Sequence, residues 1–238
     1  WFDTAVAYVS DWASAFANSF YLNIIKEDRW KLLTEGLNVT MQVTLGSAFF
    51  GLLLGILVAF MRISNVKWLK RPADLYVTVI RGTPLLIQLM IIYYVIFQGV
   101  RINQVLVAII AFSINSGGYV GEIIRAGIQA IDKGQTEASR SLGMNYRQTM
   151  IYIILPQAFR NVLPALCNEV IALMKETSVV GYIALRDLTK GADVIRSRTY
   201  DPFMPLMAVA LIYLLLTTLL GYLFGKLERR LSNSDKHS

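Results

Sequence analysis

The hydrophobic positions of this sequence gather into long runs that contain no charged residue. A helix that crosses the roughly 30 Å hydrocarbon core of a bilayer needs about 20 such residues. Four runs approach or exceed this length, and a fifth, at residues 161–185, is interrupted by charges. The pattern therefore predicts a membrane protein with five helical spans. The charge-free spans are residues 37–61, 82–100, 102–121 and 202–225, and the interrupting residues are Glu169, Lys175 and Glu176.

Two local patterns refine the first and second spans. Small residues recur at intervals of four along the first span and form a stripe that lets another helix backbone come close. The second span opens with RGTP at residues 81–84, where a charge, a glycine and a proline suited to the first helical position predict that a helix restarts, with Thr83 as its cap. The small residues are Ser47, Gly51, Gly55 and Ala59.

Residues 1–36 carry aromatic side chains at every fourth position of one stretch, which predicts an amphipathic helix at the outer membrane interface. A sixth span over residues 4–25 is the alternative, although polar residues dilute that stretch. At the other end, residues 228–238 are predicted to form a cytoplasmic tail. The repeated aromatic residues are Tyr8, Trp12, Phe16 and Phe20.

Composition and charge agree with this picture. Hydrophobic residues make up 55% of the chain and charged residues 16%, and the mean hydropathy is +0.50. The net charge of +7 does not indicate nucleic acid binding, because the basic residues cluster between and after the spans. The positive-inside rule places these regions in the cytoplasm, the N-terminus outside and the C-terminus inside. The basic regions contain Arg62, Lys67, Lys70 and Arg71; Arg125, Lys133, Arg140, Arg147 and Arg160; and Lys226, Arg229 and Arg230.

One predicted outer loop departs from that rule. The loop after the fourth span contains four basic residues, although three aspartates accompany them. The predicted orientation therefore depends on the other loops. The residues of this exception are Arg186, Lys190, Arg196 and Arg198, with Asp187, Asp193 and Asp201.

The sequence offers little for catalysis or metal binding. Cys167 is the single cysteine and His237 the single histidine, so the chain can form neither a Cys/His metal cluster nor a Cys–His nucleophile pair. It also has no GxxxxGK[ST] phosphate-binding loop, since GYLFGK at residues 221–226 has the wrong spacing. We therefore predict that the chain is not an enzyme and binds no metal or cofactor.

A polar stretch, GQTEASRSLG at residues 134–143, separates two apolar runs on the predicted cytoplasmic side. It is predicted to form a short helix that ends at Gly143, followed by a helix capped by Asn145 and Gln148. One face of the short helix is suited to docking on a soluble partner; an ordinary solvated loop is the alternative. The predicted exposed face is Gln135, Glu137, Ser139 and Arg140, while Ala138 and Leu142 are predicted to pack inward.

EASRSLG, followed by nine residues and then IILP, resembles the EAA signature of permease subunits of ABC importers. Two further stretches, RGTPLLIQL and the run from GEIIRAGIQAIDKGQTEA through LPQAFRNVLPALCNE, are similar to the polar amino acid uptake branch of that family. The similarity extends from about residue 35 to residue 227. The matching signature positions are Glu137, Ala138, Gly143, Ile153, Leu155 and Pro156, with Ser139 in place of the second alanine.

The resemblance implies an all-α membrane protein with the five-transmembrane-helix fold of type I ABC importer permeases over residues 37–227. It implies a permease subunit of an ATP-driven importer of polar amino acids, multi-pass in the bacterial cell membrane. The implied partners are an ABC ATPase dimer that binds ATP and Mg, a second permease in a homodimer or heterodimer, an extracellular amino acid binding protein and membrane lipids. An ion-gradient-driven secondary transporter or channel is the alternative.

Under this resemblance the short polar helix is a coupling helix that docks in a groove of the ATPase, and Pro156 and Pro164 bend the helix that leads into the fourth span. The implied ATPase-coupling residues are Gln135, Glu137, Ala138, Ser139, Arg140 and Gly143.

Polar residues inside the membrane are costly, so they are candidates for the substrate site. The helix start with Arg81, Gly82 and Thr83 is the candidate for a substrate carboxylate, and Glu169 for an ammonium group. Structural roles are the alternatives, with Arg81 at the interface and Glu169 as a contact between helices. The hydrogen-bonding candidates near Glu169 are Asn115, Ser116 and Asn168. Glu122 with Arg125 is predicted to be an i, i+3 ion pair, and Lys175 with Glu176 a helix end at the outer surface.

Overall fold

The computed structural model describes residues 2–233, and side chains from residue 11 to residue 230. The side chains of Tyr8 and His237, and the end of the predicted tail beyond residue 233, lie outside it. Within the described part, every regular element is helical, as predicted. The α-helices are α1 (Phe2–Phe20), α2 (Trp30–Ile63), α3 (Lys67–Gly82), α4 (Leu85–Ile91), α5 (Gln104–Gln129), α6 (Lys133–Ser141), α7 (Tyr146–Thr149), α8 (Leu155–Glu176), α9 (Leu188–Thr199) and α10 (Phe203–Asn233). Short π- or 3-10-helical segments are Tyr21–Ile25, Lys26–Asp28, Ile92–Ile96, Met150–Ile154 and Thr177–Ile183.

Four helical stretches within residues 2–233 are long and apolar enough to cross a bilayer. They contain the first, third, fourth and fifth predicted spans or most of them. A further crossing arises only if α3 and Leu85–Ile96 are taken together, and these two are bent by 108° at their junction. The four stretches are Trp30–Ile63, Gln104–Gln129, Tyr146–Ile183 and Phe203–Arg230.

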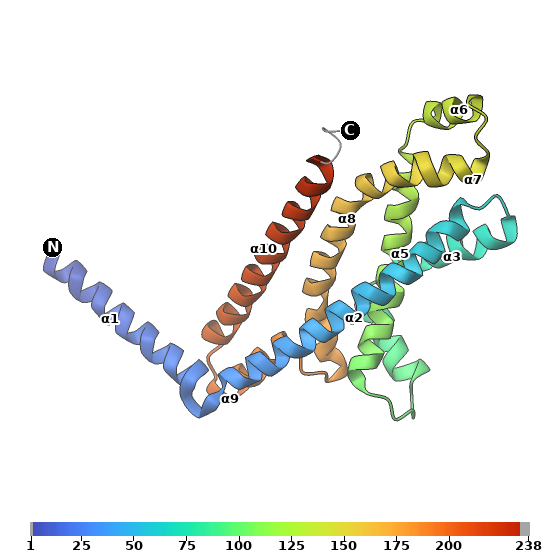
Figure 1. Cartoon of the computed structure of the whole chain (residues 1–238). Helices are drawn as coiled ribbons and strands as arrows, with labels where there is room; N and C mark the ends of the chain where they lie inside the picture. The colour runs from blue at the N-terminus through green and yellow to red at the C-terminus, as the bar shows by residue number, and fades with distance from the viewer. Residues whose placement is uncertain (1, 234–238) are drawn as a thin grey trace.

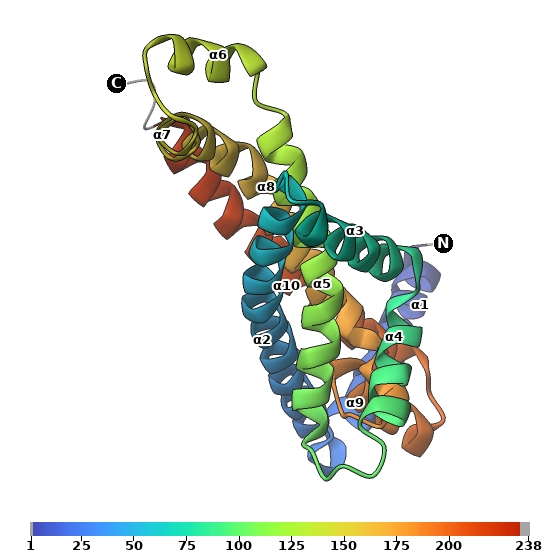
Figure 2. The same ribbon diagram turned by 90° about the vertical axis from the view of Figure 1, so that its right-hand side faces the viewer.

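The second span therefore needs a correction. The helix restart predicted at residues 81–84 is confirmed, but the restarted helix covers only Leu85–Ile96 rather than residues 82–100. A helix of that length cannot cross the hydrocarbon core alone. Only together with the preceding helix α3 would it make one broken span, and Figure 2 shows α3 running across the bundle at a steep angle to α4.

The stripe of small residues in α2 packs against α5 of the same chain. At Gly55 the two helices come so close that a Cβ atom would lie 2.4 Å from Cγ1 of Val120 and 3.0 Å from the backbone nitrogen of Gly121. Ser47 on the same stripe donates a hydrogen bond of 3.3 Å to the C=O of Ile109. Backbone-to-backbone packing of this kind replaces the hydrophobic effect, which lipid cannot supply between helices.

We expect Gly55→Ala to destabilise the fold by about 1–3 kcal/mol, because the added methyl group must push α2 away from α5. Thermal unfolding in detergent measures the effect. Gly221→Ala in α10 is the matched control, since a Cβ there meets nothing within 4 Å and alanine favours a helix over glycine. Equal melting temperatures for the two variants would contradict the close α2–α5 packing.

At the opposite end from α6, α9 packs on the beginning of α2 and on α10. Leu188 and Ile195 of α9 are buried together with Leu33 and Val209. Asp187 caps α9 by accepting hydrogen bonds from the backbone N–H groups of the helix start. Burial raises the pKa of the Asp187 carboxyl, although these hydrogen bonds oppose the shift.

α8 ends at Glu176, which confirms the predicted helix end at Lys175 and Glu176. Pro156 lies in the first turn of α8 and Pro164 inside it. Figure 1 shows the chain turning between α7 and α8, close to the predicted proline bend.

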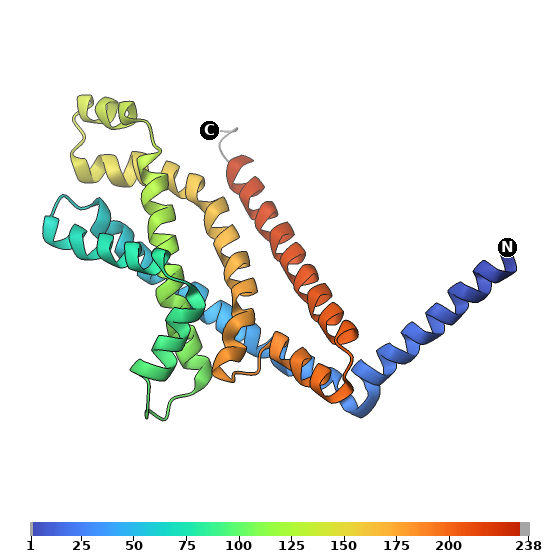
Figure 3. The same cartoon turned by 180° about the vertical axis from the view of Figure 1, so that it is seen from behind.

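α1 projects away from the bundle as a separate arm (Figures 1 and 3). The rings of Trp12 and Phe16 stack on each other with centroids 5.6 Å apart, and both side chains are exposed. Exposed aromatic rings on one helical face are compatible with the predicted interfacial helix, and its placement at the outer interface stays a prediction.

Candidate functional site

The polar stretch between the third and fourth spans forms α6 at one end of the molecule (Figure 1). Asp132 caps its start by accepting a hydrogen bond of 2.9 Å from the backbone N–H of Gly134. Gly143 follows its end with a φ of 83°, and the N–H groups of Gly143 and Met144 return hydrogen bonds of 3.0 and 3.1 Å to the last turn. The helix therefore closes in a Schellman turn that needs a left-handed residue, which confirms the predicted stop.

The next helix begins with the predicted capping pair. Asn145 and Gln148 exchange two hydrogen bonds of 2.9 Å between side chain and backbone. Within the described residues α6 rests mainly on α7 and the π-helical turn Met150–Ile154, at the side away from the spans. α6 is therefore a short helix held on one side by the segment that follows it and exposed on its other side.

The predicted orientation of α6 was partly wrong. Ser139 is 4% exposed, and its hydroxyl lies 2.9 Å from the C=O of Thr136 and 3.1 Å from Oγ1 of Thr149. Ala138 is exposed, and Leu142 is 83% exposed. The reason is that the Ser139 hydroxyl finds polar partners on the α7 side, while Leu142 follows the chain outward into the Gly143 turn. The other predicted face residues, Gln135, Glu137 and Arg140, are exposed as predicted.

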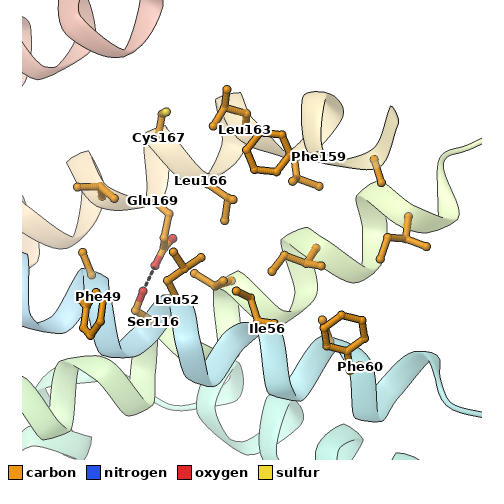
Figure 4. A pocket seen from close by; sticks show the side chains of 18 of the residues that line it. Phe49, Leu52, Ile56, Phe60, Ser116, Phe159, Leu163, Leu166, Cys167 and Glu169 are labelled. Atoms are coloured by element: carbon orange, nitrogen blue, oxygen red, sulfur yellow. Dashed lines mark hydrogen bonds between the residues drawn. The ribbon is translucent and has the colours of Figure 1, made fainter. Parts of the chain in front are cut away.

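A pocket of about 640 Å³ lies between α2, α5 and α8, with Phe224 of α10 at its edge. Figure 4 shows Glu169 pointing into it from α8 toward Ser116 of α5. The Ser116 hydroxyl donates a hydrogen bond of 3.1 Å to Oε1 of Glu169. The other side chains that line the pocket are apolar, and none of the described lining residues is basic. A cationic group would therefore be attracted to Glu169 more strongly than a neutral or anionic one.

A second polar group surrounds the break between α3 and α4, and its centre is Gln88. The side-chain NH₂ of Gln88 donates to the C=O of Ile80 at 2.8 Å and to the Thr83 hydroxyl at 2.7 Å, and its C=O accepts from Asn115 at 3.0 Å. Gln88 was not among the residues predicted from the sequence, although an amide in an otherwise apolar run was the available signal. The predicted cap is corrected, because Pro84 precedes α4 without a side-chain cap and Thr83 ends α3.

Arg81 belongs to neither of these groups. Its Nη1 lies 3.9 Å from Oε1 of Glu122, and its guanidinium lies over the ring of Tyr119, 5.4 Å from the centroid. Glu122 also binds Arg125 at 2.5 Å, which confirms the predicted i, i+3 ion pair.

Arg62, in the last turn of α2, completes this ionic cluster. It donates a hydrogen bond of 2.7 Å to Asp74 of α3 and another to Glu122 of α5. The cluster therefore joins three helices, a role for Arg62 and Asp74 that the sequence did not reveal because their partners are distant in the chain.

The predicted substrate residues thus fall into separate places. Ser116 and Glu169 meet in the pocket, whereas Asn115 and Thr83 meet at Gln88. Asn168 is exposed on α8, and Gly82 is exposed at the end of α3. In the described residues, no group of three or more His, Cys, Asp and Glu side chains is arranged to hold a metal ion.

The helices, the α6 turn and the membrane pocket agree with one known family. The chain matches the family described as "Binding-protein-dependent transport system inner membrane component" over residues 51–233. This chain belongs to that family. The permease is 43% identical to the arginine transport system permease protein ArtQ of Bacillus subtilis (strain 168) over 205 residues, which cover 85% of this chain and 94% of ArtQ.

Solved structures place the permease in the predicted fold. A chain in the "Crystal structure of an amino acid ABC transporter with histidines" is 46% identical, with a TM-score of 0.80, and the match covers 84% of the permease and 94% of that chain. A chain of the MetNI methionine ABC transporter shares the fold at 21% identity and a TM-score of 0.70, over 87% of the permease and 99% of that chain. The all-α type I importer permease fold and the multi-pass inner-membrane location are therefore confirmed.

Proposed function

We propose that the permease forms the membrane path of an ATP-driven importer of polar amino acids. The observation that carries the proposal is α6, a short exposed helix with the EAA signature, in a chain whose relatives include an amino acid transport permease. ATP and Mg would bind to a partner ATPase, because this sequence has no phosphate-binding loop. An ion-gradient-driven transporter is the competing function, and it would have no use for a docking helix.

In this mechanism α6 docks in a groove of the ATPase through its exposed side chains, Gln135, Glu137, Ala138 and Arg140, with Leu142 as an apolar tip. Ser139 holds α6 on α7 rather than meeting the ATPase, as its burial and its contact with Thr149 suggest. Gly143 fixes the angle between the two helices. Closure of the ATPase on ATP would then move α6 and, through α7, the spans.

A cationic side chain of the substrate, distant from its carboxylate, is assigned to Glu169 and Ser116, because their pocket is otherwise apolar and of a size suited to a small ligand. The substrate carboxylate is assigned to Arg81, Gly82 and Thr83 at the exposed end of α3. When the substrate binds, Arg81 would leave Glu122 and pair with the substrate carboxylate. Asn115, through Gln88, would hold Thr83 in place, and Asn168 would add a hydrogen bond from α8.

The proposed orientation places α6, α7 and the C-terminus in the cytoplasm and α1 and α9 outside, as the distribution of basic residues favours. An extracellular binding protein would deliver the amino acid at the α9 end. A second permease, identical or related, would complete the path.

The test uses the permease reconstituted in vesicles with its ATPase and binding protein. We expect uptake of labelled amino acids, with arginine and histidine tested first, that requires both ATP hydrolysis and the binding protein. Uptake driven by a proton or sodium gradient without ATP would overturn the proposal in favour of the secondary transporter.

A further inference from the structure

We propose that the outer face of α3 binds anionic phospholipid headgroups in the leaflet where this helix begins. One row of α3 side chains recurs at helical spacing and points away from the protein. Trp68 is 89% exposed and Leu75 is 65% exposed, although both are large and apolar. The row consists of Trp68, Pro72, Leu75 and Val79, all of them exposed.

The opposite side of α3 is used for packing within the chain. Ala73, Val77 and Ile80 are buried on that side, and Ala73 and Val77 form a core cluster with Val58 of α2. The opposite face of α3 therefore packs within the chain, while the exposed row is left uncovered by the described residues. An amphipathic helix of this design lies in the membrane interface with its free apolar side in the acyl region.

Three cations flank the row at the start of α3. Lys67, Lys70 and Arg71 are exposed, and none of them has a hydrogen-bond or ion-pair partner within the described residues. Arg62, only a few residues earlier, is fully engaged with Asp74 and Glu122. The first turn of α3 also contains no acidic residue, so the positive end of the helix adds to the unbalanced charge.

The pairing of charges with an apolar row identifies the occupant. An acidic protein surface would neutralise the cations but would leave the apolar row without apolar contacts. A phospholipid satisfies both, because its phosphate meets the cations and its acyl chains cover the row. Three unpaired positive charges favour a headgroup with net negative charge over a zwitterionic one. The exposed tryptophan beside the cations is typical of the headgroup level.

The experiment measures which lipids lie next to Trp68. The assembled transporter is placed in phosphatidylcholine vesicles that contain a minor fraction of phosphatidylglycerol, and one of the two lipids carries bromine on its acyl chains as a fluorescence quencher. The difference between the wild type and Trp68→Phe isolates the Trp68 signal. We expect phosphatidylglycerol to be enriched around Trp68 by at least about tenfold over its bulk fraction, from three cations near the surface.

Replacement of Lys67, Lys70 and Arg71 together by glutamine is expected to abolish this enrichment, as is high salt. The matched control replaces Arg101, Arg186 and Arg198 by glutamine, which removes the same charge from exposed residues of the predicted outer loops that have no partner among the described residues. That control should retain the enrichment. Quenching by phosphatidylglycerol in proportion to its bulk fraction in the wild type would overturn the proposal. Absence of quenching by either lipid would also overturn it, because a protein partner would then cover the face. Neither result depends on which substrate is carried.

Discussion

Gly143→Val is expected to reduce ATP-driven uptake by at least about tenfold while leaving the spans folded. Gly143 has a φ of 83°, in the region where a non-glycine residue costs about 1–2 kcal/mol and a β-branched residue more. The valine would shift the chain out of the Schellman turn and change the direction of α6 relative to α7. Because α6 is held by little else, its docking face would no longer match a groove on the ATPase. Uptake and ATP hydrolysis in vesicles are the measurements.

The matched control is Gly143→Asn. A Cβ at this position meets nothing within 4 Å, so the two variants differ mainly in backbone strain, and asparagine tolerates the left-handed conformation better than valine. The asparagine variant should therefore retain most uptake. Combining Gly143→Val with Glu137→Lys should uncouple hydrolysis from uptake completely. Normal uptake in that double variant would count against α6 as the coupling element.

Glu169→Gln is expected to reduce uptake by at least about 30-fold. Loss of one charge from a desolvated pair costs about 2–5 kcal/mol, and each 1.4 kcal/mol is about a factor of ten. Glutamine has nearly the same shape and its C=O still accepts the hydrogen bond from Ser116, so the pocket should remain intact. Initial uptake rates across a range of amino acid concentrations, at fixed ATP, measure the effect.

Glu176→Gln is the control for that experiment, because Glu176 is an exposed carboxylate at the end of the same helix. It should transport normally. If Glu169→Gln also transports normally but melts at a lower temperature, Glu169 is a structural contact between α5 and α8, which is the alternative that the sequence left open.

The spans could be predicted from sequence because the bilayer restricts which backbone conformations can cross it. A backbone in the hydrocarbon core must form its own hydrogen bonds, so runs such as residues 37–61 and 202–225 are helices wherever they pack. Caps and stops were predictable for a similar reason. The Asn145–Gln148 box and the Gly143 turn depend on residues a few positions apart.

Features that depend on distant partners were not predictable. The rotation of α6 is set by the contact of Ser139 with Thr149, so helical periodicity alone assigned the wrong face. Gln88 accepts a hydrogen bond from Asn115 only because folding places the two residues side by side. In the same way, Arg62 pairs with Asp74 and Glu122 only in the folded chain. The bend of 108° between α3 and α4 likewise reflects packing of α3 on two other helices, which the RGTP sequence permits but does not determine.

The helical stretch Tyr146–Ile183 carries the support of α6 at one end and Glu169 further along its length. A displacement imposed at Thr149 by α6 would therefore pass along one bent but uninterrupted helical stretch to the wall of the pocket, and the π-helical turn and two prolines are the places where this stretch can flex. Movement of the ATPase would then reach the substrate pocket without a series of side-chain rearrangements. Stiffening the π-helical turn or the proline sites should change the rate of substrate release more than the affinity for substrate.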